Sequence, residues 1–344
     1  VTIFDPERAT PGYNIYTNYV ARTYLTDLAG KHVHEWKAPL AIRDCEDVEM
    51  LEDGGALMVC VTGGLVRLDW DSNALWDLKM KVHHDVAVRP DGTILALYHS
   101  EEAYKGRRVL FDHILTLSAE GRILRDWSMF DHLDELKRRH EPSPLDEPPP
   151  PGHDPLSEHG DMDYYHTNTV KVLPETPLGA RDRRFRAGNI LVSLRNVNTI
   201  LILDQDDDSV TWSWGPGELE LQHMPTMLPN GHILVFDNGL HRGFSRVVEV
   251  DPVSKRIVWE YSGSPPKSFY SKWRGSAQRF DNGNTLICEA DRGHAFEVTP
   301  QGKIVWEFWN TEYSPEGQRR RMYRLLRLPR ATVDPLLARE SRGR

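Results

Sequence analysis

Cysteine is scarce in this chain, and long apolar runs are absent from it. The 344 residues include three cysteines, Cys45, Cys60 and Cys288, and no two of them have C-x-x-C spacing. The absence of this spacing excludes a zinc-ribbon or thioredoxin-type motif. The odd and low number of cysteines does not suggest a scaffold held together by disulfides, although one disulfide can form. No apolar run approaches the roughly 20 residues that span a bilayer, so we expect no membrane partner.

Basic residues are outnumbered as well. The chain has 51 acidic residues against 42 Lys and Arg, for a formal net charge of -9. Non-specific nucleic-acid binders normally carry the opposite sign, so we expect no nucleic-acid partner. The first residues, VTIFDPERATPGYN, lack the basic and apolar regions of a signal peptide. We therefore favour a cytoplasmic location for the chain as given, or a periplasmic one if a signal peptide was removed, and expect a monomer or homodimer.

A tryptophan pattern, by contrast, recurs along the chain. Six segments read apolar-x-apolar, a polar turn and then apolar residues leading to Trp, as in TYLTDLAGKHVHEW and AFEVTPQGKIVWEF. Alternating strands around turn residues predict β-hairpins. The tryptophans are 40, 51, 87, 45 and 47 residues apart, and four of these spacings match the roughly 40–50-residue period of propeller blades. They are Trp36, Trp76, Trp127, Trp214, Trp259 and Trp306.

A second, more continuously apolar hairpin lies between the tryptophan segments, as in HHDVAVRPDGTILALYH. Such runs are typical of strands buried on both faces, so each repeat has four strands. The first outer hairpin, Tyr24–Trp36, has no inner hairpin before it, and the last strand, Met322–Leu328, has no outer hairpin after it. We predict that the two termini complete one blade and remove an exposed edge. Residues 13–330 are then a single all-β domain, a six-bladed β-propeller.

Two stretches fall outside the repeat. The 87-residue gap after Trp127 contains an insertion at 128–162, with a predicted helix in MFDHLDELKRRH and a proline run, Pro148–Pro151, of polyproline II type. Long insertions in compact domains are often lids or binding loops, and we expect one of these here. Residues 331–344 are expected to form a basic, solvated tail.

Three histidines begin predicted inner strands: His84 in HDVAV, His166 in HTNTV and His223 in HMPTM. The starts of the innermost strands ring one mouth of a propeller's channel, so we expect the three imidazoles to converge. Asn168 lies two residues after His166 on the same strand face. Arg195, which ends the next strand in SLRN, can bind an oxyanion through two parallel hydrogen bonds. The set predicts a site for an anionic group such as a sulfuryl, phosphoryl or carboxylate.

Aromatic residues flank the same strands. Alternation places Tyr164 on the face of His166, and Phe236 lies in a neighbouring strand, so we expect these two rings to contact a small aromatic substrate. His83 and Asp85 are expected on the opposite face of their strand from His84. Asp85 is expected to make a structural turn contact.

An ordered set of short motifs resembles the bacterial arylsulfate sulfotransferases, and the resemblance covers about residues 13–310. The motifs are HHD (83–85), YHTN (165–168), SLRN (193–196), QH (222–223) and LPNGHILVFDNG (228–239). The best-known members of that family are periplasmic and have an extra N-terminal domain and a disulfide. This sequence has no visible extra domain and no obvious cysteine pair.

The resemblance implies a six-bladed propeller that moves a sulfuryl group from a phenolic sulfate to another phenol. It implies no nucleotide sulfate donor and no cofactor. The transiently sulfated histidine of the family falls on His223, and its other site residues fall on His84, His166, Asn168 and Arg195. A histidine nucleophile divides the transfer into two steps with ping-pong kinetics. Either His84 or His166 would protonate the leaving phenoxide, with His166 favoured.

Two other hypotheses remain open from the residues. Three neutral imidazoles can hold one divalent metal with open positions, so His84, His166 and His223 would serve a metal-dependent lyase or hydrolase. Arg195 argues against a metal, because a fixed cation beside it is unfavourable. The third hypothesis is a non-catalytic propeller that binds a ligand or partner, and the grouped His, Asn and Arg side chains argue against a purely structural channel.

Overall fold

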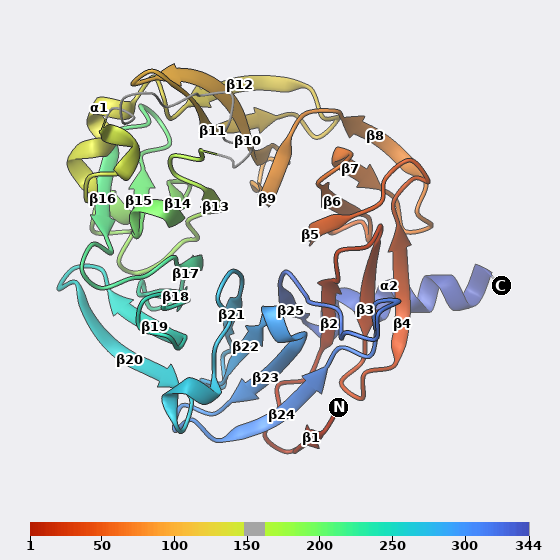
Figure 1. Ribbon diagram of the computed structural model, residues 1–344. Helices are drawn as coiled ribbons and strands as arrows, with labels where there is room; N and C mark the ends of the chain where they lie inside the picture. The colour runs from red at the N-terminus through yellow and green to blue at the C-terminus, as the bar shows by residue number, and fades with distance from the viewer. Residues whose placement is uncertain (148–161, 344) are drawn as a thin grey trace.

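The chain forms a ring of six antiparallel sheets around a central channel (Figure 1). The computed structural model describes residues 1–147 and 162–343. Every sheet has four strands, and one has a fifth at its outer edge. The first strand of each blade faces the channel, and the fourth lies at the circumference (Figure 1). The predicted six-bladed propeller is confirmed.

Blades 1 to 5 are each built from four consecutive strands, ordered from the channel outward. Glycines with positive φ, such as Gly231 (86°) and Gly283 (85°), make the turns of the inner hairpins. The strands are β5 (Cys45–Met50), β6 (Ala56–Cys60), β7 (Gly64–Leu68) and β8 (Ala74–Leu78) in blade 1; β9 (Val82–Val88), β10 (Ile94–Tyr104), β11 (Arg107–Leu117) and β12 (Ile123–Ser128) in blade 2; β13 (Thr167–Val172), β14 (Ile190–Leu194), β15 (Thr199–Leu203) and β16 (Val210–Trp214) in blade 3; β17 (His223–Met227), β18 (Ile233–Asp237), β19 (Arg246–Asp251) and β20 (Arg256–Ser262) in blade 4; and β21 (Ser276–Arg279), β22 (Thr285–Glu289), β23 (His294–Val298) and β24 (Ile304–Trp309) in blade 5.

Blade 6 is made from both ends of the chain. Its inner strand is β25 (Leu325–Leu328), followed outward by β2 (Tyr13–Thr17), β3 (Arg22–Thr26) and β4 (His32–Lys37). β25 pairs with β2 in antiparallel register, which ties the C-terminal strand to the N-terminal segment. The predicted closure is therefore confirmed, and β2 is a strand that the repeat search missed. At the other edge, β1 (Ile3–Phe4) pairs with β24 of blade 5.

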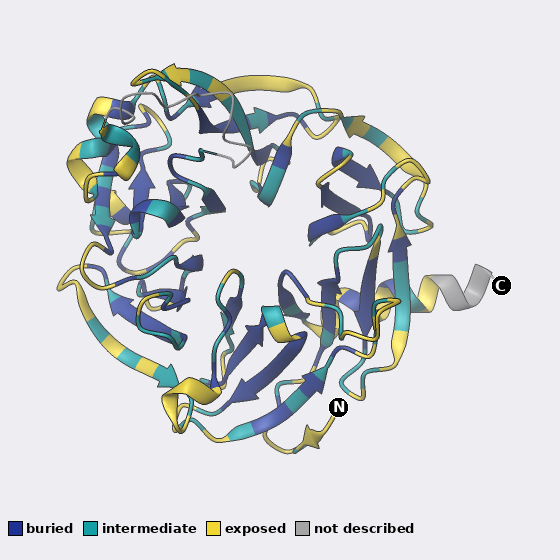
Figure 2. Cartoon of the chain, in the orientation of Figure 1, coloured by how far each residue is buried: buried dark blue, intermediate teal, exposed yellow. Residues whose placement is uncertain are grey.

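The recurring tryptophans pack where neighbouring blades meet. The interior strands are mostly buried, and the outer strands mix buried, intermediate and exposed residues (Figure 2). Trp36 and Trp306 are fully buried. The indole N–H of Trp76, Trp259 and Trp306 donates to a carbonyl of the following blade, on Ala119 at 2.9 Å, Pro300 at 3.0 Å and Leu28 at 2.8 Å respectively. An indole ring buries a large apolar area between blades while its single N–H donor is satisfied, which explains why Trp recurs at this position.

The helices depart in part from the prediction. Instead of one helix over 129–140, the insertion has α1 (Leu133–Leu136) and η1 (Lys137–Arg139), and Leu133 and Leu136 are buried against blades 2 and 3. The stretch expected to be a basic tail contains α2 (Arg330–Gly343), which follows β25 and buries Val333. Neither α-helix in the described ranges is long and apolar enough to cross a bilayer. Pro148–Pro151 lies outside the described residues. The remaining short helices are η2 (Pro144–Asp146), η3 (Arg183–Phe185), η4 (Arg195–Val197), η5 (Pro266–Ser268) and η6 (Ala290–Arg292).

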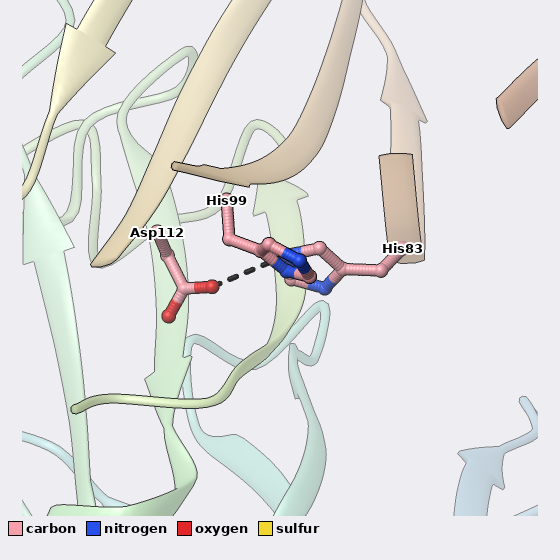
Figure 3. Close-up of side chains that lie close together, drawn as sticks. All are labelled: His83, His99 and Asp112. Carbon is pink, nitrogen blue, oxygen red and sulfur yellow. Dashed lines mark ion pairs between the residues drawn. The ribbon is translucent and has the colours of Figure 1, made fainter. Parts of the chain in front are cut away.

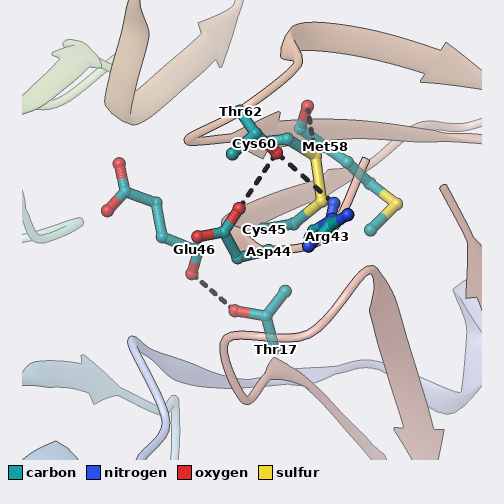
Figure 4. Close-up of a disulfide and its surroundings, with 8 residues drawn as sticks. All are labelled: Thr17, Arg43, Asp44, Cys45, Glu46, Met58, Cys60 and Thr62. Atoms are coloured by element: carbon teal, nitrogen blue, oxygen red, sulfur yellow. Dashed lines mark hydrogen bonds between the residues drawn. A yellow bond between two sulfur atoms is a disulfide. The ribbon is translucent and has the colours of Figure 1, made fainter. Parts of the chain in front are cut away.

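Cys45 and Cys60 form a disulfide (Figure 4). The two residues are directly opposite each other in the β5–β6 pair of blade 1. The expectation that the chain has no obvious cysteine pair was wrong, because the hairpin register, and no local motif, brings the two thiols together.

Candidate functional site

The inner strands are irregular where the site residues lie. The pairing of β9 with β10, of β13 with β14 and of β17 with β18 shifts register near the start of each inner strand. His84 and His166 have positive φ, 58° and 50°, which is uncommon for residues other than glycine. Bulges of this kind redirect side chains, and strained backbone conformations cluster at functional sites.

The three histidines do not share one register position, contrary to the expectation. Counted back from the last pair before the hairpin turn, His84 and His223 are each four residues before Val88 and Met227, whereas His166 is six residues before Val172. The bulges nevertheless bring His84 and His166 into contact, with 3.0 Å between their Nε2 atoms. His166 is also close enough to His223 for its charge to affect that residue. The structure therefore groups the three imidazoles, as predicted, by a different local geometry.

The contact between His84 and His166 fixes how they hold protons. Two ring nitrogens at this distance share one proton, because one donates and the other accepts. Nδ1 of His166 lies 2.8 Å from Oδ2 of Asp163, and since a carboxylate only accepts, Nδ1 carries a proton and donates it to Asp163. Burial, and then the nearby His166, lower the pKa of His84 well below its usual value, so His84 is neutral.

His223 is held in a single tautomer. Its Nδ1 lies 2.7 Å from Oδ1 of Asn238 and 3.1 Å from the carbonyl of Leu221. The Asn238 amide nitrogen donates to the carbonyls of Ser271 and Arg274 at 2.7 and 3.0 Å, which turns its oxygen toward the ring. Both neighbours of Nδ1 are therefore acceptors, so Nδ1 carries the proton and Nε2 keeps the lone pair.

Charge keeps this imidazole neutral. Burial lowers the pKa of His223 well below 6.5, and the second cause is the guanidinium of Arg195. Arg195 is 8% exposed and begins η4, directly after β14. Its Nη1 donates to Oδ1 of Asn196 at 2.8 Å, while its Nε has no partner. In the described ranges it makes no ion pair, so a permanent buried cation faces the histidines without a counterion.

Two aromatic rings, neither singled out from the sequence, border the cluster. Trp273 is 44% exposed, and the Arg195 guanidinium lies 5.4 Å from its ring centroid. Tyr323, just before β25, stacks nearly parallel on His84 at 5.7 Å. Tyr323 is also buried, with an unpartnered hydroxyl. The exposed Trp273 is the ring that an aromatic ligand beside Arg195 can reach.

The structure buries both Tyr164 and Phe236. Tyr164 is fully buried, stacks on Phe111 at 5.0 Å and donates its hydroxyl to Asp146 at 2.8 Å. It precedes β13, so the strand alternation used to place it does not apply there. Phe236 is directly opposite His223 in the β17–β18 pair, but its ring is fully buried, 5.6 Å from the ring of Phe269. Neither ring has exposed surface, which disfavours the predicted contact of either with a substrate.

Asn168 is part of the channel wall. It is fully buried, and its amide nitrogen donates to the carbonyl of Gln222, the residue before His223, at 2.8 Å. This bond ties β13 to the chain entering β17. Asn168 therefore holds the backbone next to His223. Its side-chain oxygen accepts a hydrogen bond from the hydroxyl of Thr169 at 3.1 Å.

An ion network crosses the channel beside the histidines. Arg324, just before β25, donates from Nη1 to Asp47 at 2.8 Å and to Asp85 at 2.6 Å, and from Nη2 to the Asn168 carbonyl at 2.8 Å. Lys171 contacts Asp85 at 2.9 Å. Asp85 therefore serves an inter-blade network and not the turn contact expected for it. Arg324 links the closing strand to three other blades.

The sequence contained usable signals for part of what was missed. Asp163 lies three residues before His166, and Asn238 is inside the motif LPNGHILVFDNG that carried the family resemblance. Trp273 and Tyr323 come from other blades, and nothing local in the sequence connects them to the histidines.

The metal hypothesis receives no support at His84, His166 and His223. Among the described residues, one group of His, Cys, Asp or Glu has ligand atoms all within 4.8 Å of one another. That group is His83, His99 and Asp112 (Figure 3). It lies behind His84, whose ring centroid is 5.0 Å from that of His83.

Comparison with known proteins agrees with this geometry. The arylsulfotransferase (ASST) family model matches residues 48–311, which is more than half of the chain. The chain belongs to the arylsulfotransferase family. Membership supports a sulfotransferase-like function for this propeller, and the match includes His84, His166, Arg195 and His223. None of the curated proteins compared with the sequence matches it.

Solved structures show the same fold at low identity. A protein of unknown function from Bacteroides caccae has a TM-score of 0.57 at 15% identity, over 92% of this chain and 98% of that one. A streptogramin B lyase has a TM-score of 0.51 at 10% identity, over 94% of this chain and 92% of that one. At such identities the likeness concerns the fold alone.

Proposed function

We propose that this protein transfers a sulfuryl group from a phenolic sulfate to a second phenol through a sulfated His223. The observation that carries the proposal is the locked tautomer of His223, whose Nδ1 is held by Asn238 and whose Nε2 keeps its lone pair beside Arg195. No nucleotide sulfate donor is needed. The substrates are small aromatic molecules.

In the first step, Nε2 of His223 forms a bond to sulfur while the bond from sulfur to the aryl oxygen breaks. The ring becomes cationic as it is sulfated, and Asn238 accepts the hydrogen bond from the Nδ1 proton that the ring retains. Arg195 stabilises the charged sulfuryl oxygens as the bonds rearrange. Trp273, next to Arg195, stacks on the aromatic ring of the donor.

The leaving phenoxide takes a proton from the His84–His166 pair. His166 is the donor, because Asp163 holds its ring through Nδ1, and burial keeps His84 neutral. In the second step, the neutral His166 removes the proton of the acceptor phenol, whose oxygen attacks sulfur and releases His223. Protons and charges thus return to their starting positions after one transfer.

Steady-state kinetics with p-nitrophenyl sulfate and a phenol acceptor test the proposal. We expect p-nitrophenol release to require the acceptor for turnover, with parallel double-reciprocal lines typical of a ping-pong reaction. His223→Ala should abolish it. The matched control is His232→Ala, which removes a histidine of the same blade that pairs with Glu249 at 2.7 Å.

Turnover retained in His223→Ala would contradict the histidine intermediate. Release that ignores the acceptor would indicate hydrolysis in place of transfer. No release with any acceptor would favour the hypothesis of a ligand-binding propeller.

A further inference from the structure

Three neighbouring strands in blade 2 bring together a second group of polar side chains. His99 of β10 and Asp112 of β11 are directly opposite each other in the strand pair. His83 lies in the bulged part of β9, between its pairings at Val82 and Val86. Nε2 of His83 is 3.2 Å from Oδ1 of Asp112, and one ligand atom from each of the three lies within 4.8 Å of the others (Figure 3).

Asp112 presents a carboxylate oxygen to this group. The side chain is fully buried, and its Oδ2 accepts from the backbone N–H and the hydroxyl of Thr167 at 2.8 and 2.7 Å. Its Oδ1 forms an ion pair with Nε2 of His83 at 3.2 Å, and neither buried atom has another partner among the described residues. The described residues give His99 no hydrogen bond. A cation within reach of Oδ1 stabilises a buried carboxylate of this kind.

We propose that His83, His99 and Asp112 bind one divalent transition-metal ion of the zinc class. Two imidazoles and one carboxylate are a donor set for Zn²⁺, Co²⁺ or Fe²⁺, whereas Mg²⁺ and Ca²⁺ prefer oxygen ligands. Ligand atoms about 2.0–2.2 Å from a common metal lie roughly 3–4 Å apart, which the His83–Asp112 separation satisfies. Thr167 acts as the outer partner that orients Asp112, as in many metal sites.

The ion links strands β9, β10 and β11 at the end that carries His84. Because His83 and His84 are consecutive residues of the β9 bulge, the ion holds the backbone from which His84 reaches His166. The proposed ligands share no side chain with the sulfuryl-transfer site, so a test of the metal site does not depend on the proposed function.

Metal binding to the purified full-length protein tests the proposal. After removal of metal with a chelator, the protein is titrated with Zn²⁺ by calorimetry and with Co²⁺ by visible absorption. We expect one ion per chain, d–d bands of a bound Co²⁺ ion, and a rise in Tm on Zn²⁺ addition. His99→Ala, at the most exposed of the three ligands, should abolish binding. Thr167→Val should weaken it about 10- to 100-fold, since it removes only the outer hydrogen bond.

Two controls separate this site from the other histidines. His232→Ala and His223→Ala should both bind one ion as tightly as the wild type. Stoichiometric binding that survives in His99→Ala, or that disappears in His223→Ala, would overturn the assignment. So would a wild-type protein that binds neither ion. If His99→Ala fails to fold, the Co²⁺ spectrum of the wild type and the affinity of Thr167→Val decide the question.

Discussion

Replacing Arg324 with methionine should lower the free energy of unfolding by about 3–5 kcal/mol, the usual cost of removing one partner from a buried ion pair. Arg324 is 4% exposed and donates to Asp47, Asp85 and the Asn168 carbonyl. Methionine keeps much of the stem but leaves two buried carboxylates facing each other, with Lys171 as the remaining cation. The loss also detaches β25 from blades 1, 2 and 3.

The corresponding change in melting temperature follows from the chain length. Unfolding entropy of about 2.1 cal/mol/K per residue gives about 0.7 kcal/mol/K for this protein, so Tm should fall by about 4–7 °C. Differential scanning calorimetry measures it directly. The matched control is Arg22→Met, because Arg22 pairs with Glu35 at 3.1 Å with side chains 50% and 33% exposed. An exposed pair of this kind contributes about 0–1 kcal/mol.

Equal effects of Arg324→Met and Arg22→Met would refute the reasoning. So would an Arg324→Met protein that melts within about 1 °C of the wild type. Either result would mean that the closing strand is held by its pairing with β2 and by apolar packing, and that the channel network contributes little.

Three further predictions concern the site and its scaffold. Because the pKa of His223 lies well below its usual value, its imidazole stays neutral, and the first burst of p-nitrophenol should not slow as the pH is lowered from about 8 to about 6. Stopped-flow absorbance that shows the rate falling by half near pH 6.5 on acidification would contradict this. Trp273→Ala should raise KM for aryl sulfates about 2- to 10-fold with kcat nearly unchanged, because it removes one aromatic contact with the substrate. An unchanged KM in initial-rate assays would show that Trp273 does not contact the substrate. Substituting Cys45→Ser and Cys60→Ser together should lower the free energy of unfolding, measured in urea, by about 3 kcal/mol, because the disulfide closes a loop with a sequence separation of 15. A reductant should destabilise the wild type and leave the double variant unchanged.

The propeller could be predicted from the sequence because its repeat is built on local chemistry. The tryptophans at the blade contacts and the glycine turns recur at fixed spacing, so six hairpins and a closing blade follow from them. Strand β2 (Tyr13–Thr17) was missed because its inner partner is β25 at the other end of the chain, although its outer partner β3 is adjacent in sequence. The disulfide was missed because the register of the β5–β6 hairpin decides that Cys45 and Cys60 face each other.

The site was predictable in its residue types and less so in its geometry. The structure groups the predicted histidines with Arg195. Their positions depend on bulges in the inner strands, which an argument from strand alternation does not include. Tyr164 was placed by strict alternation and Phe236 by its position in a neighbouring strand, and both are buried. Asp163 and Asn238, which set the proton positions of His166 and His223, lie three and 15 residues from those histidines, but only the folded backbone shows that they contact them.

The mass of the intact protein after brief exposure to p-nitrophenyl sulfate tests the central claim most directly. The account predicts a gain of about 80 Da, one SO3 group on Nε2 of His223, that a phenol acceptor removes. His223→Ala should show no gain, while His232→Ala should show the full gain. An adduct that persists in His223→Ala, or a wild type that releases p-nitrophenol without ever gaining mass, would contradict the account.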